Sequence, residues 1–139
     1  DRPDGESPYG IHDDLRSMMQ QKVGIVRTAD ELNEALEGLD SLRARAATVS
    51  VTGNIQFNPG WHLALDLSNM LDISEAVTRA ALAREESRGA HTREDYPEEE
   101  EAWGGLNLIV SQDESETILR KESLPEMPDD VRELLHGGE

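Results

Sequence analysis

The side chains best suited to chemistry lie in one short stretch, residues 87–97, which we call the SRGAHTREDYP loop. They are two guanidinium groups, an imidazole, two carboxylates and a phenol: Arg88, Arg93, His91, Glu94, Asp95 and Tyr96. An imidazole beside a carboxylate is a pairing used in general acid–base catalysis, and guanidinium groups bind carboxylates through two hydrogen bonds. The same groups also tie loop backbone to a neighbouring surface. This structural use is favoured, because no second cluster elsewhere in the chain completes a catalytic site.

A catalytic use of the loop would make the chain a small hydrolase or lyase that employs His91, Arg93 and Asp95. That hypothesis requires a deep pocket beside His91. The histidines lie far apart and lack the HExxH spacing of zinc proteases: His12, His62, His91 and His136. The glycine pairs at 104–105 and 137–138 do not open a helix after a strand, so they are not phosphate loops. The residues alone therefore predict no catalytic, cofactor-binding or metal-binding residue.

Length and charge limit the kinds of partner. The 139 residues are enough for one domain with a modest core, and they carry 13 Lys+Arg against 30 Asp+Glu, a formal net charge of −17. Such a surface repels nucleic acid and anionic lipid, so we expect no nucleic-acid partner. The absence of cysteine excludes disulfides and thiolate sites. No run reaches the roughly 18 apolar residues of a membrane span, so we expect no direct membrane insertion.

Three amphipathic segments precede the loop and must position it. Residues 1–7 form a polar linker, and an apolar stripe with helical spacing follows over residues 8–23. Thr28 and Glu31 have the spacing of a capping box, in which each side chain accepts a hydrogen bond from the other residue's amide. A leucine stripe then runs over residues 32–46. Short connections between such helices predict an up-down-up bundle.

The third segment is the longest and leads directly into the loop. Its stripe starts after Asn58-Pro59 and continues to Ser87, which predicts a helix roughly 40 Å long. Gly89 is then expected to be the left-handed C-terminal cap of that helix. Since this helix exceeds its neighbours in length, we expect the end that carries the loop to project beyond the bundle.

The chain changes character after Pro97. Residues 98–101 are an acidic run, residues 106–110 and 117–121 read as short strands, and residues 112–115 read as the turn between them. An extended tail follows over 124–128, with one or two helical turns over 129–136. We predict a mainly α fold, namely a three-helix bundle over residues 8–97, followed over residues 98–139 by the acidic segment, a small β-hairpin and the tail, all in one domain.

Taken together, these residues resemble the C-terminal region of the succinate dehydrogenase/fumarate reductase flavoprotein subunit. Residues 85–97 (EESRGAHTREDYP) carry the most specific part of the resemblance. Residues 19–28 (MQQKVGIVRT) resemble the end of that region's first helix, and residues 69–71 and 80–89 resemble its third. The resemblance covers essentially residues 7–124. It implies a spectrin-like three-helix bundle packed against a flavin domain.

The resemblance also implies a setting. The family's full-length chain binds FAD and interconverts succinate and fumarate, with its flavin fold, capping domain and substrate-binding residues upstream of this region. None of those motifs is present here, so the resemblance transfers no catalytic or cofactor-binding residue, and we expect this chain alone to be inactive and without FAD. Its implied partners are the flavin and capping domains and an iron–sulfur subunit. The implied location is cytoplasmic, peripheral on the inner face of the cell membrane.

Two alternatives stay open. L-aspartate oxidase has a similar C-terminal region that includes the Ser-Arg-Gly-x-His pattern, although the approach to the third helix over residues 58–67 favours the dehydrogenase. The second alternative is a free-standing acidic helical adaptor, although the start at Asp1 without Met favours a piece excised from a longer polypeptide. Under the family hypothesis the loop docks on the flavin domain through Arg88, His91, Arg93, Asp95 and Tyr96. We then expect Arg88 and Arg93 to have few partners within this chain.

Overall fold

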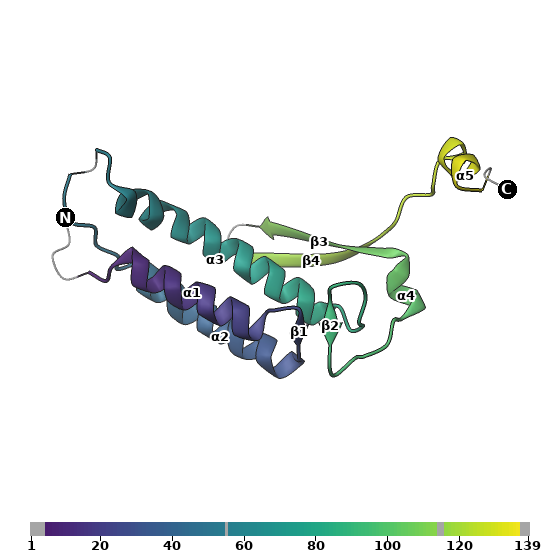
Figure 1. Ribbon diagram of the computed structural model, residues 1–139, viewed down its shortest axis with the longest axis horizontal. Helices are drawn as coiled ribbons and strands as arrows, with labels where there is room; N and C mark the ends of the chain where they lie inside the picture. The colour runs from purple at the N-terminus through teal and green to yellow at the C-terminus, as the bar shows by residue number, and fades with distance from the viewer. Residues whose placement is uncertain (1–4, 55, 114–115, 137–139) are drawn as a thin grey trace.

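The structure is a computed structural model that describes residues 5–54, 56–113 and 116–136. Three long helices lie side by side in an elongated molecule, and a two-stranded hairpin runs along the third (Figure 1). In chain order the elements are α1 (Pro8–Lys22), β1 (Val26–Arg27), α2 (Ala29–Ala46), α3 (Pro59–Ala83), β2 (Thr92–Arg93), α4 (Glu101–Gly104), β3 (Leu106–Asp113), β4 (Glu116–Ser123) and α5 (Asp129–His136). The predicted fold class, a helical bundle with a C-terminal hairpin, is confirmed.

Local sequence explains where the three long helices begin. Pro8 stands in the first turn of α1, where its missing N–H costs nothing. The amide of Glu31 donates to the Thr28 hydroxyl at 3.3 Å, and the amide of Thr28 donates to the Glu31 carboxylate at 2.8 Å. This pair is the predicted capping box of α2. The Asn58 side chain accepts a hydrogen bond from the amide of Gly60 at 3.1 Å and so caps α3.

Two apolar clusters hold the bundle together. One draws buried side chains from all three long helices: Ile11, Leu15, Leu39, Leu42, Leu67 and Leu71. The other lies where α1 ends and α2 begins, and it contains Val23, Leu32, Ala35 and Ala81. Met19 packs against both clusters. Burial of a large aliphatic side chain contributes about 1.5–3 kcal/mol, so these helical stripes provide most of the favourable free energy of folding.

The third helix ends earlier than predicted. It stops at Ala83, and Arg84 is already extended with φ −89° and ψ 98°. Gly89 has the predicted positive φ of 59°, but it lies in a turn instead of capping the helix. That turn joins Arg88 and His91, whose backbones exchange hydrogen bonds at 2.8 and 3.0 Å. Gly89 thus occupies the first central position of a two-residue turn, where a positive φ favours glycine.

We expected the end of the third helix that carries the loop to project beyond the bundle. The structure corrects this expectation, because the loop is paired with another segment of the chain and does not project freely. Strands β1 and β2 pair in parallel, with Val26 opposite Thr92 and Arg27 opposite Arg93. The amide of Thr92 donates to the Ile25 carbonyl at 3.0 Å. This pairing ties the loop to the connection between α1 and α2, and Figure 1 shows the two segments adjacent at one end of the bundle.

The C-terminal part packs against α3 through the hairpin. β3 and β4 pair antiparallel from Leu106 opposite Ser123 to Asp113 opposite Glu116, so both predicted strands are present and longer than expected. Residues 114–115 of the predicted turn lie outside the described part of the chain. The Thr117 hydroxyl donates to the Glu75 carboxylate of α3 at 3.3 Å. The helix predicted over residues 129–136 is α5, which Figure 1 places on the tail beyond the hairpin. The domain boundaries at residues 7 and 97 stay predictions.

None of the helices in the described ranges is both long enough and apolar enough to cross a bilayer.

Candidate functional site

The loop is held in shape by Ser87. Its amide donates to the Glu98 carbonyl at 2.9 Å, which closes the base of the loop. Its hydroxyl lies 2.8 Å from the Tyr96 carbonyl and accepts a hydrogen bond from the Arg93 amide at 2.9 Å. A serine at this position therefore satisfies backbone groups that the short strands leave unpaired.

Arg93 is a buried cap at the C-terminal end of α3. Only 1% of the residue is exposed. Its Nη1 donates to the carbonyls of Ala81 and Leu82 at 3.0 and 3.1 Å, and its guanidinium lies 4.9 Å from the centre of the Tyr96 ring. The last carbonyls of a helix lack intrahelical partners and carry the negative end of the helix dipole, so a cation is favourable there.

Asp95 connects Arg93 to the opposite end of a different helix. Its two carboxylate oxygens accept from Nε and Nη2 of Arg93 at 2.8 and 2.7 Å. One of them also accepts from the amide of Ala29, the first residue of α2, at 3.0 Å. Chiefly through the hydrogen bonds from Arg93, the pKa of Asp95 is lowered to about 2. This ion pair therefore joins the C-terminus of α3 to the N-terminus of α2.

Glu86 is a second buried centre, with no exposed surface. Its carboxylate accepts from Nε and Nη2 of Arg88 at 3.1 Å each, from Nη1 of Arg84, and from the amide of Glu100 at 3.0 Å. The hydrogen bonds from Arg88 are the main reason that the pKa of Glu86 is lowered to about 2. Arg84 also lies over the buried Trp103 ring, 5.2 Å from its centre. Glu86 thus anchors residues 98–101 beside the end of α3.

His91 faces positive charge. Its Nε2 lies 3.1 Å from the Arg84 carbonyl. Burial lowers the pKa of His91, and the guanidinium groups of Arg27, Arg93 and Arg84 lower it further. The imidazole is therefore neutral at pH 7. It has no carboxylate partner within the described residues, so it lacks the arrangement of a general base oriented by an acid.

The structure corrects one prediction about the loop and supports another. The prediction that Arg88 and Arg93 have few partners within this chain is wrong, because both make ion pairs and backbone hydrogen bonds. The favoured structural use of Arg88, Arg93 and Asp95 agrees with the geometry. Sequence reasoning missed Glu86, although arginines two residues before and after it were a usable signal. It also missed Arg27, whose surroundings arise only from the pairing of β1 with β2.

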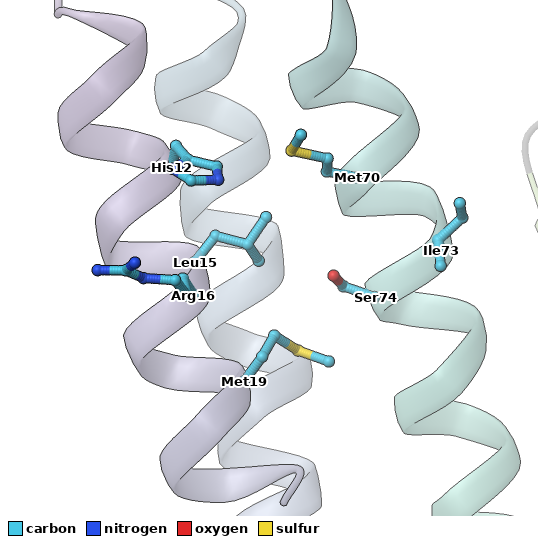
Figure 2. A pocket seen from close by; sticks show the side chains of 7 residues that line it. All are labelled: His12, Leu15, Arg16, Met19, Met70, Ile73 and Ser74. Carbon is cyan, nitrogen blue, oxygen red and sulfur yellow. The ribbon is translucent and has the colours of Figure 1, made fainter. Parts of the chain in front are cut away.

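Three grooves formed by described residues lie away from the loop. A groove of about 340 Å³ lies between α1 and α3, and its lining residues are drawn in Figure 2: His12, Leu15, Arg16 and Met19 of α1, and Met70, Ile73 and Ser74 of α3. Two further grooves lie near the start of α1 and between α3 and the hairpin. His91 lines none of these three grooves of the described residues. These three grooves therefore give no support to a hydrolase or lyase that uses His91. Among the described residues, no three His, Cys, Asp or Glu side chains gather as a metal site.

Known proteins resemble the chain over most of its length. The family described as "Fumarate reductase flavoprotein C-term" matches residues 12–128. The fumarate reductase (CoM/CoB) of Methanothermobacter marburgensis has a polypeptide that is 41% identical over 81% of this chain and 21% of its own length. The fumarate reductase flavoprotein subunit of Mycobacterium tuberculosis is 34% identical over 87% of this chain and 21% of its own.

A solved structure agrees with these relatives. A chain of the Sdh1 complex of Mycobacterium smegmatis matches with a TM-score of 0.83 and 43% identity, over 92% of this chain and 23% of that one. The present chain therefore spans about a fifth of the length of the relatives that it matches. Both the sequence match and the shared fold lead to one assignment: the chain belongs to the family of fumarate reductase/succinate dehydrogenase flavoprotein C-terminal domains.

Proposed function

We propose that this chain is the non-catalytic C-terminal domain of an FAD-dependent flavoprotein subunit that interconverts succinate and fumarate, and that it packs against the flavin-binding part of the full-length polypeptide. The observation that carries the proposal is the family match over residues 12–128 in a chain about a fifth as long as its relatives. The remaining length of such a polypeptide is where we place substrate binding and electron transfer.

The residues of this chain do not fit a flavin site. Dinucleotide phosphates bind at a glycine-rich turn that follows a strand and opens a helix. Gly104 is instead the last residue of α4, and Gly105 connects that helix to β3. The guanidinium groups of Arg88 and Arg93 are already paired with carboxylates of this chain. We therefore place the FAD on the rest of the polypeptide and assign no catalytic residue here.

The docking surface is the outer edge of the loop and of β1. Ile25, Val26 and Tyr96 expose 65%, 51% and 39% of their surface there. Exposed aliphatic and aromatic side chains on a rigid edge are typical anchors of an interface. The other docking candidates act from behind this edge by fixing its shape: Arg88, His91, Arg93 and Asp95.

The same assignment gives the wider setting of the chain. We place it beside the flavin and capping domains of its own polypeptide and in a complex with an iron–sulfur subunit. Its location would then be cytoplasmic and peripheral, on the inner face of the cell membrane. The net charge of −17 supports contact through protein partners, because such a surface is repelled by anionic lipid.

The proposal is tested by comparing this chain with the full-length flavoprotein subunit. We expect the full-length subunit to carry FAD and to oxidise succinate with an artificial acceptor or reduce fumarate with a reduced dye. We expect this chain alone to show no flavin absorbance and no turnover. Flavin bound to the chain alone in a stoichiometry near one, or turnover by it, would overturn the proposal.

A further inference from the structure

Arg27 has an unusual environment at the junction of α1 and α2. It belongs to β1, and its carbonyl accepts from the Glu94 amide at 3.1 Å, so its backbone is fixed. Its side chain makes one long hydrogen bond, from Nη1 to the Val23 carbonyl at 3.4 Å. Its Nε is buried and has no partner. A buried donor without an acceptor costs free energy, so this guanidinium is incompletely satisfied within the described residues.

The other arginines of the described chain differ from Arg27 in one respect. Each has a carboxylate within 4.0 Å: Arg16, Arg43, Arg45, Arg79, Arg84, Arg88, Arg93, Arg120 and Arg132. Carboxylate hydrogen bonds raise the pKa of Arg43 and of Arg93, whereas burial and then the Arg93 guanidinium lower the pKa of Arg27. An unpaired guanidinium in a chain of net charge −17 is unexpected unless its carboxylate comes from elsewhere.

Two carboxylates close to Arg27 in the fold already accept from other donors. Both oxygens of Asp95 accept from Arg93, and one also accepts from the Ala29 amide. The Glu31 carboxylate accepts from the amide and hydroxyl of Thr28 in the capping box. Arg27, Arg93 and Arg84 together act on His91 as positive charges. Three guanidinium groups thus converge on His91, and among the described residues Arg84 and Arg93 have a carboxylate within 4.0 Å whereas Arg27 has none.

The surface around Arg27 has the composition of an interface. Ile25 and Val26 precede it in the chain, and each exposes more than half of its surface. Arginine beside exposed apolar and aromatic side chains is the combination enriched at protein interfaces. The chain spans only about a fifth of its relatives' length, so most of the full-length polypeptide remains to cover this edge.

We propose that Arg27 receives an Asp or Glu side chain from the flavin-binding part of the full-length polypeptide, which seals the junction of the two parts. This inference rests on the proposed function, and it names the contact that the docking surface makes. A guanidinium offers two parallel N–H donors to one carboxylate, which fixes both position and orientation. Arg27 thereby takes the role that sequence reasoning assigned to Arg88 and Arg93.

The test uses Arg27→Lys in the full-length flavoprotein subunit, with a carbodiimide that joins an amine to a carboxylate as an amide with loss of water. Peptide mass mapping should find residue 27 linked to an Asp or Glu upstream of this chain. Arg16→Lys is the matched control, because Arg16 lies on exposed α1 surface with Asp13 at 3.6 Å. In this control, residue 16 should be cross-linked only to an Asp or Glu of this chain or should form no cross-link.

Three results of the peptide mapping without added succinate would overturn the inference. They are no link from residue 27, links only to acids of this chain such as Glu31 or Asp95, and equal upstream links from the control position. Loss of the link when succinate is added would also overturn it, since a free dicarboxylate would then be the occupant. Flavin content of the same samples separates the two proposals, because a flavin-loaded subunit without the link refutes the contact but leaves the domain assignment intact.

A second variant measures the consequence. Arg27→Gln in the full-length subunit should increase the rate of limited proteolysis at the junction of the two parts by about tenfold, as expected for loss of one charge-assisted contact. Arg16→Gln should leave the rate unchanged. An unchanged rate in Arg27→Gln would contradict the inference even if a link were found.

Discussion

At the scale of single residues, the loop is an electrostatic connection between helix ends. Arg93 neutralises the carbonyl end of α3, and Asp95 receives the amide end of α2, so one ion pair satisfies both helix dipoles. Each partner also completes the hydrogen bonds of the other. Burial of the Arg93 guanidinium is tolerated because each of its nitrogens has an acceptor.

The first prediction concerns removal of these guanidinium groups. Arg93→Ala should lower the free energy of unfolding of the chain by about 3–5 kcal/mol, because it leaves Asp95 and the carbonyls at the end of α3 without their donor. Arg93→Lys should recover only part of the loss, since an amine cannot reproduce the forked contacts. Arg16→Ala, on exposed α1 surface, should stay within about ±0.5 kcal/mol. Urea unfolding curves give all three values.

Arg88 provides a second prediction, which distinguishes support from docking. Arg88→Ala should destabilise this chain by about 3 kcal/mol, because the buried Glu86 carboxylate loses its principal donors. The same substitution should cost no more in the full-length subunit, since the partner of Arg88 lies within this chain. If the substitution lowered the free energy of unfolding of the full-length subunit strongly and that of the isolated chain only slightly, Arg88 would instead be a residue of the docking interface.

The third prediction is the response to acid. The pKa values of Glu86 and Asp95 are lowered to about 2 in the folded chain, below their unfolded values of about 4. Between those values the unfolded state binds more protons, so the stabilisation is complete above about pH 5 and disappears as pH falls towards 2. The lowered pKa of His91 acts in the same direction below about pH 6.5. In urea unfolding at several pH values, Glu86→Gln should show a shallower loss than the wild type.

At the scale of elements, the turn at Gly89 sets the geometry of the loop. Gly89 has φ 59° and a Cβ placed there would contact nothing, so Gly89→Ala tests backbone strain alone. The expected cost is about 1–2 kcal/mol. Gly105 is the matched control, since it also has open space but a φ of −99°. Gly105→Ala should change stability by less than about 0.5 kcal/mol, and equal effects at the two positions would show that strain is not the cause.

The elements also show how far sequence reasoning reaches. Helical stripes, the Thr28 capping box and the hairpin were predictable, because each depends on residues close together in the chain. The early end of α3 was not predictable from its stripe, because Arg84 and Glu86 are withdrawn from the helix by contacts with residues 98–106. The pairing of β1 with β2 involves two residues from each strand, and so short a segment has no periodic signal. The partners of Arg88 and Arg93 depend on the early end of α3 and on this pairing, so they were not predictable either.

At the scale of the whole molecule, contacts within this chain hold the docking edge in one conformation in the absence of a partner. The β1–β2 pairing, the Arg93–Asp95 ion pair and the Glu86 cluster all converge at the end of the bundle where α3 finishes. An edge that is already ordered loses little conformational freedom on docking, so more of the contact energy appears as affinity. A C-terminal domain built in this way can hold its interface without contributing to catalysis.

Charge over the whole molecule leads to the last prediction. With a net charge of −17, repulsion between carboxylates opposes the folded state, and it acts over a Debye length of about 30 Å at 0.01 M salt. At 0.1 M the length falls to about 10 Å, so long-range repulsion weakens while the buried ion pairs of Glu86 and Arg93 are screened much less. The Tm of this chain should therefore rise between these salt concentrations. Glu98→Gln, which removes one charge in the exposed acidic run, should give a smaller rise. A flat or falling Tm would mean that exposed ion pairs, such as Arg16 with Asp13, contribute more than the net repulsion removes.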